Sequence, residues 1–168
     1  MPREATLLAG PARTLAEFTR CELIVPRLGE CDPAGILGEL SRVLGRSGCV
    51  PDALSFYQAA LHQESLSDSP TRSLIAVAHG RLGGVHRLQF ALGRHPMPVL
   101  WSARNRRPVQ LVFLLAVPAT ESACYLLLLS RLARLGQDAE TVARLLAADD
   151  APALLAVLAE ARLPVKPA

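Results

Sequence analysis

Position 79 carries a histidine that directly follows a short apolar run. The run Leu74-Ile75-Ala76-Val77-Ala78 has the composition of a buried β-strand, and Gly80 follows the histidine. An ordinary histidine, with a pKa of about 6.5, is largely uncharged at neutral pH, so a ring nitrogen can act as a nucleophile. We therefore expect His79 to be partly exposed and to suit the role of a phosphate acceptor. The alternative is a strand-end histidine that only bonds a carbonyl group.

Two arginines and a tyrosine are further candidates for the same site. Arg72 and Arg81 flank the predicted strand, and either can hold a phosphoryl group through paired N–H donors. Both are also consistent with solvated loop arginines. Tyr125 lies near the start of a predicted helix, where its hydroxyl can donate to a phosphoryl oxygen or its ring can simply pack.

Patterns typical of other chemistries are missing from the sequence. His62, His86 and His95 do not have the spacing of a metal site, and we interpret Arg104-Asn105-Arg106-Arg107 as a solvated loop. A net charge of +3 with scattered arginines argues against a nucleic-acid partner. There is no Walker loop, Gly-rich nucleotide fingerprint or Ser/His/Asp order. We expect neither a metal nor a cofactor.

Cysteine usage and hydropathy predict a cytoplasmic protein. The four cysteines form no CxxC pair and have no histidine at zinc spacing, which favours buried, reduced thiols. No segment reaches the roughly 18 apolar residues of a membrane span. The N-terminus also lacks the basic and apolar regions of a secretory signal.

Strand-like and helix-like segments are mixed along the chain, which predicts one layered α/β domain. We expect a mixed sheet of four or five strands with helices on both faces, in a domain over residues 15–162. A loosely ordered segment 1–14 and a tail 163–168 flank it, and Gly80, Gly83 and Gly84 are predicted to form a turn. The expected strands are 21–25, 74–78, 85–92, 96–101 and 109–117, and the expected helices are 33–44, one from near 51, 121–135, 138–146 and 151–158.

This series of elements resembles the enzyme IIA domains of the fructose/mannitol and nitrogen-regulatory branch of the bacterial phosphotransferase system. Typical members carry Ile-Ala-Ile/Val-Pro-His-Gly, matched here by Ile75 to Gly80 with Ala78 in place of the proline. Their later strand, Pro-Val-Asp-Leu-Val-Phe-Leu-Leu, is matched by Pro108 to Leu115 with Gln110 in place of the acid. The resemblance implies an enzyme IIA fold in which His79 takes a phosphoryl group from an HPr-like carrier protein.

The chain departs from this family around the acceptor. Family members usually carry Gly-Asn/Glu-Gly/Ser before the Ile-Ala strand, where Arg72 and Ser73 stand here as the residues to meet phosphate or a partner. A family arginine is replaced by Gln63, and the second active-site histidine by Tyr125.

Two functions are consistent with this pattern. In the first, the protein is a regulatory phosphocarrier that accepts phosphate on His79 from an HPr-like donor and regulates a partner protein. In the second, it is a non-catalytic binding module that kept the enzyme IIA fold but lost phosphotransfer. Whether the chain is an enzyme depends on which of the two holds.

Overall fold

Helices and strands are interleaved along the part of the chain that the computed structural model describes, residues 14–66, 74–102 and 107–161. The expected loose segment before residue 14 and the expected tail 163–168 lie outside these residues. The elements are the 3-10 helices η1 (Leu15–Phe18) and η2 (Cys21–Leu23), the strands β1 (Ile24–Val25), β2 (Ile75–Leu82), β3 (Gln89–Leu100) and β4 (Pro108–Pro118), and the α-helices α1 (Pro33–Arg46), α2 (Ala53–Leu66), α3 (Ala123–Gln137), α4 (Ala139–Ala147) and α5 (Ala151–Glu160).

The four strands form one mixed sheet in the order β1-β3-β4-β2. β4 lies between β3, to which it is antiparallel, and β2, to which it is parallel; β1 pairs with β3 in parallel. Nearly every side chain of β4 is buried, as expected of an inner strand with both faces covered. The predicted α/β layer with a mixed sheet of four or five strands is therefore confirmed.

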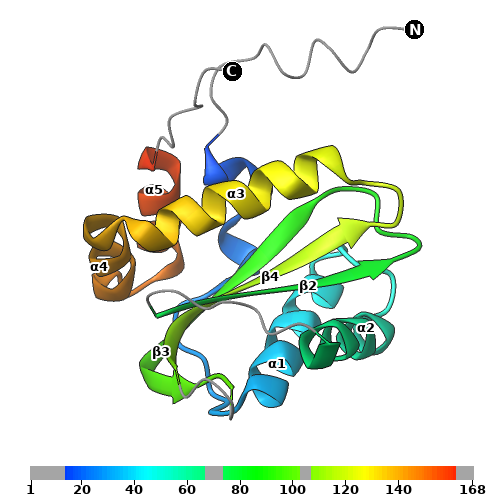
Figure 1. Cartoon of the computed structure of the whole chain (residues 1–168), viewed down its shortest axis with the longest axis horizontal. Coiled ribbons are helices and arrows are strands. Elements are labelled where there is room, and N and C mark those ends of the chain that lie inside the picture. The colour runs from blue at the N-terminus through cyan, green and yellow to red at the C-terminus, as the bar shows by residue number, and fades with distance from the viewer. Residues whose placement is uncertain (1–13, 67–73, 103–106, 162–168) are drawn as a thin grey trace, which may run out of the picture.

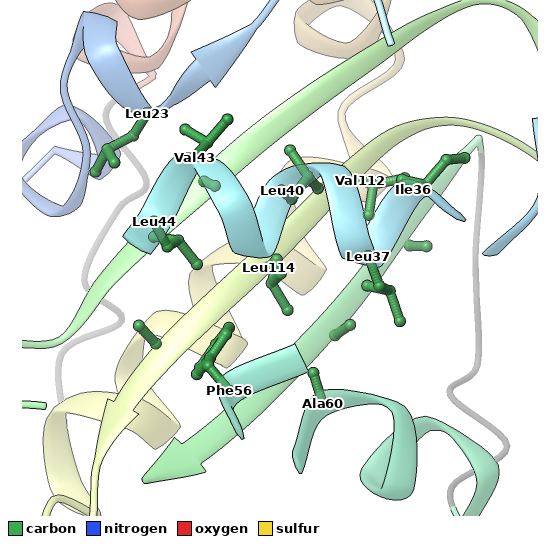
Figure 2. Packing of buried hydrophobic residues seen from close by; sticks show 14 of the residues in the cluster. Leu23, Ile36, Leu37, Leu40, Val43, Leu44, Phe56, Ala60, Val112 and Leu114 are labelled. Carbon is green, nitrogen blue, oxygen red and sulfur yellow. The ribbon is translucent and has the colours of Figure 1, made fainter. Parts of the chain in front are cut away.

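Helices cover both faces of this sheet (Figure 1). α1 and α2 pack on one face, and α3, α4 and α5 on the other. α1 begins as its sequence predicts, because the Asp32 side chain accepts a hydrogen bond from the Gly35 amide at 2.7 Å and Pro33 occupies the first turn. Figure 2 shows the labelled apolar residues of α1 lying across the sheet, and they share one core cluster with Val112 and Leu114 of β4; these helix residues are Ile36, Leu37, Leu40, Val43 and Leu44.

The strand predictions need three corrections. The expected strand 21–25 is mostly the turn η2, closed by the Leu23 amide on the Arg20 carbonyl at 2.9 Å, and only Ile24 and Val25 pair with β3. The expected strands 85–92 and 96–101 contribute to one strand, β3, which begins only at Gln89 and whose pairing with β4 shifts register between Arg94 and Val99. The shift spans two prolines, which have no N–H to give to a ladder.

The third correction concerns the strand that carries His79. β2 does not end there but continues to Leu82, because Gly80 and Arg81 pair with β4 as regularly as the residues before them. Gly80 is buried within the strand, and the turn follows at Gly83 and Gly84. His79 is therefore an internal strand residue.

The cysteines are free thiols, although the expectation that they are buried holds only for Cys49. Cys31 is exposed, because it lies in the polar loop that precedes α1. No helix among the described residues combines the length and the apolar character that crossing a bilayer requires.

Candidate functional site

His79 lies on the face of β2 that is covered by α3. Side chains alternate along a strand, so His79 and Arg81 share this face, while Ala78 and Gly80 face α1 and α2. His79 pairs with Leu115 of β4 through the backbone, and its side chain is about half-buried. The strand thus fixes the backbone position from which the imidazole extends, while part of the ring stays accessible to solvent.

Tyr125, in the first turn of α3, meets the imidazole. Its hydroxyl lies 3.2 Å from Nδ1 of His79, and the two ring centroids are 5.3 Å apart at a 52° tilt. The start of α3 is held by Glu121, whose side chain accepts a hydrogen bond from the Cys124 amide at 3.0 Å. The N-terminal turn of α3 therefore determines the position of the phenol relative to His79.

Arg81 holds the connection between β4 and α3. Its Nη1 donates to the backbone carbonyl oxygens of Pro118 at 2.9 Å and Ala119 at 3.3 Å, and also to that of Glu121. Its guanidinium carbon lies 5.4 Å from the centroid of the Tyr125 ring, within the range of a cation–π contact. Arg81, Tyr125 and His79 therefore form one contiguous cluster, which we call the His79 cluster.

Burial and charge act together on this cluster. Burial lowers the pKa of His79, and the nearby Arg81 charge lowers it further, since both disfavour the imidazolium. Burial raises the pKa of Tyr125, with Arg81 acting in the opposite direction. At neutral pH the site therefore presents an uncharged imidazole next to a protonated phenol, and an uncharged ring nitrogen is the form that can attack an electrophile.

The structure brings three of the five predicted site residues together: His79, Arg81 and Tyr125. Arg72 and Ser73 lie outside the described residues. The binding of Arg81 to the loop before α3 is not visible in the sequence, because its acceptors are backbone carbonyls, which leave no side-chain pattern. Among the described residues, no three potential ligands gather as a metal site.

A comparison with family models shows the family to which this chain belongs. The model of the family described as "Phosphoenolpyruvate-dependent sugar phosphotransferase system, EIIA 2" matches residues 17–161. The chain belongs to this EIIA family. The match includes all three members of the His79 cluster and every strand of the sheet.

Relatives of this EIIA protein include a nitrogen regulatory protein of Bradyrhizobium diazoefficiens, 32% identical over 103 residues, which are 61% of this chain and 67% of the relative. The solved structure of nitrogen regulatory protein IIA-Ntr from Neisseria meningitidis has a TM-score of 0.72 at 24% identity, covering 86% of this chain and 98% of that one. A complex of Escherichia coli enzyme IIAMtl with phosphorylated enzyme IIBMtl gives 0.69 at 18% identity, covering 84% and 98%. The two structures establish the shared fold of the fructose/mannitol and nitrogen-regulatory type.

Proposed function

We propose that this EIIA protein is a regulatory phosphocarrier that accepts a phosphoryl group on Nε2 of His79 from an HPr-like donor in the cytoplasm. The observation that carries the proposal is the 3.2 Å contact between Nδ1 of His79 and the Tyr125 hydroxyl. With Nδ1 engaged inside the protein, Nε2 is the nitrogen left to meet a donor. The half-buried ring and its lowered pKa support the same role, because an uncharged nucleophile is required.

The reacting tautomer follows from this contact. For Nε2 to carry a lone pair, the ring proton must be on Nδ1, where it donates to the Tyr125 oxygen. Nε2 then attacks the phosphorus atom, the nitrogen–phosphorus bond of the donor's phosphohistidine breaks, and the donor's ring leaves with the electrons of that bond. As positive charge develops on the His79 ring, the Nδ1–H···O hydrogen bond to Tyr125 strengthens. Tyr125 in this scheme orients the imidazole and is not a direct phosphate ligand.

The surface beside the cluster suits a protein partner. Leu126, the neighbour of Tyr125, is 63% exposed, and Leu127 is exposed as well. The E. coli complex of enzyme IIAMtl with phosphorylated enzyme IIBMtl supports a partner that carries a phosphoryl group. We propose that the phosphorylation state of His79 determines which protein binds here, a donor or a regulated target.

A second candidate is a binding module without phosphotransfer. It is favoured by the use of Arg81, whose Nη1 donates to backbone carbonyls at 2.9 Å and 3.3 Å. Donors engaged in this way are not available to a phosphoryl group, which carries about −1.5 to −2 charge and needs several of them. Phosphorylation of His79 would support the phosphocarrier, and its absence would support this binding module.

The test is phosphorylation by the general components of the phosphotransferase system with labelled phosphoenolpyruvate. We expect slow labelling of the wild-type protein, none in His79→Ala, and unchanged labelling in His86→Ala, the matched control for an exposed histidine. Phosphorus–nitrogen NMR coupling should place the phosphate on Nε2. Labelling that persists in His79→Ala would show that another residue accepts phosphate, and no labelling with any cognate donor would favour the binding module.

A further inference from the structure

Arg81 contacts Tyr125 by two separate routes. Through the chain, its Nη1 donates to the carbonyl oxygens of Pro118, Ala119 and Glu121, which end β4 and form the turn before α3. Through space, its guanidinium lies against the Tyr125 ring, 5.4 Å from the centroid. We propose that Arg81 is a positioning residue, which acts on His79 by holding the first turn of α3 and the Tyr125 ring in place.

The chain route depends on carbonyl groups that a turn leaves without regular partners. Among the described turn contacts, the Pro118 carbonyl accepts one more backbone hydrogen bond, from the Glu121 amide at 3.1 Å, and the carbonyls of Ala119 and Glu121 accept none. A guanidinium is a planar group with several N–H donors, so it can draw converging carbonyl oxygens to one point. Glu121 in turn caps α3 by accepting from the Cys124 amide at 3.0 Å. Weakening the hydrogen bonds of Arg81 therefore weakens the hold of Glu121 on Cys124, the residue next to Tyr125.

The space route restricts the Tyr125 ring itself. A cation over an aromatic face contributes about 0.5–1 kcal/mol at exposed sites and more when both groups are desolvated. The same ring also meets His79, at 5.3 Å between centroids. Tyr125 thus contacts both a cation that restricts its ring and an imidazole that its hydroxyl approaches.

This inference adds to the proposed function and partly rests on it. If Arg81 bound the phosphoryl group directly, its loss and the loss of the Tyr125 hydroxyl would impair phosphorylation independently. If Arg81 acts through Tyr125, the two losses are not independent, because the second change removes an interaction that the first has already weakened. A double-mutant cycle between the two residues distinguishes these cases.

The cycle uses Arg81→Lys, which keeps the charge but not the planar fork, and Tyr125→Phe, which keeps the ring but not the hydroxyl. Each single variant is expected to slow phosphorylation of His79 roughly two- to tenfold, the range of one hydrogen bond. The double variant should be no slower than the slower single variant by more than about twofold. Multiplied losses would overturn the positioning role. Arg87→Lys, at an exposed arginine nearby in sequence, is the matched control and should leave the rate unchanged.

A second measurement needs no phosphotransfer and so separates this inference from the proposed function. In 15N-histidine NMR spectra, wild-type His79 should show one dominant tautomer with the proton on Nδ1, and Arg81→Lys should show a mixture. Nuclear Overhauser contacts between the Tyr125 and His79 rings should weaken in the variant. An unchanged tautomer and unchanged contacts would overturn the inference even if labelling succeeds. Should the variant fail to fold, the wild-type contact between the Arg81 side chain and the Tyr125 ring decides, and its absence overturns the inference.

Discussion

Adjacent residues of β2 face two different environments. Gly80 faces α2, where the ring of Phe56 lies so close that a Cβ atom on Gly80 would be 2.5 Å from its Cε2 atom. His79 faces α3, where it is half-buried and has a polar contact with Tyr125. One face of the strand is filled to van der Waals contact by a fully buried aromatic ring, and the other holds a small polar cluster that solvent can reach.

The difference indicates how the fold holds a reactive side chain at a fixed position. Small residues on one face, Ala76, Ala78 and Gly80, let α1 and α2 pack closely onto the strand. Close packing resists displacement, because interiors are as dense as organic crystals. The opposite face can then present His79 and Arg81 to α3 at a constant spacing. The packed face should therefore be the rigid one.

The largest effect is expected from Phe56→Ala. Phe56 is fully buried between α2 and β2, so its removal leaves a cavity and should lower the free energy of unfolding by about 3–5 kcal/mol. Urea unfolding followed by circular dichroism measures the loss. Leu54→Ala is the matched control, since Leu54 belongs to the same helix but is 62% exposed, and it should cost no more than about 0.5 kcal/mol. Similar losses in both variants would contradict the comparison between the faces.

Gly80→Ala is expected to have the next largest effect. The added methyl group must displace the Phe56 ring or the strand, which should cost about 1–3 kcal/mol. In the Phe56→Ala background the same substitution should cost much less, because the space is then empty. Gly83→Ala, where an added Cβ atom meets nothing within 4 Å, is the control and should be nearly neutral. Additive losses for Phe56→Ala and Gly80→Ala would mean that the close contact does not restrict the strand.

The elements with local signals could be predicted from the sequence, while contacts between distant segments could not. Asp32 followed by Pro33 is a pattern typical of a helix start, and the long apolar run of β4 is typical of an inner strand. The sequence predicts a turn at Gly80, because a glycine after a strand is typical of one. The reason for this glycine lies in Phe56, a residue on another element, and no local pattern contains that information.

The site residues also differ in how far the sequence alone could indicate them. His79 was recognisable from the strand before it, and Tyr125 from its place at the start of a helix. Arg81 was recognisable only as a charge near the strand, because its carbonyl partners lie 37 to 40 residues later in the chain. The parallel pairing of β2 with β4 brings these two segments together. That pairing depends on the whole sheet and not on any local pattern in the sequence.

The packed face also holds a titratable group, which provides a comparison with His79. Glu64 of α2 accepts a hydrogen bond from the Trp101 indole nitrogen at 2.7 Å, and Trp101 is buried in the core beneath α1 and α2. Burial raises the pKa of Glu64, and the Trp101 hydrogen bond opposes this without cancelling it. Burial therefore favours the uncharged form on both faces, of Glu64 on one and of His79 on the other.

The smallest expected effect is that of Glu64→Gln, which keeps an oxygen acceptor for Trp101 and removes the charge. The folded-state pKa of Glu64 lies above its unfolded value of about 4.5, so the folded state binds the proton more tightly. Its contribution to stability is thus fully present below the unfolded pKa and is lost as the pH rises through the folded pKa. Glutamine does not titrate, so the stability of the variant should match that of the wild type near pH 4 and exceed it at pH 7. The gain should be less than about 1 kcal/mol, because a charge-assisted hydrogen bond is also lost.

Urea unfolding followed by the fluorescence of Trp101, the single tryptophan, measures the stability of both proteins against pH. Glu22→Gln, at a carboxylate whose side chain is 70% exposed, should show no such rise. A variant less stable than the wild type at pH 7 would mean that the carboxylate charge stabilises this face, and the parallel with His79 would then fail.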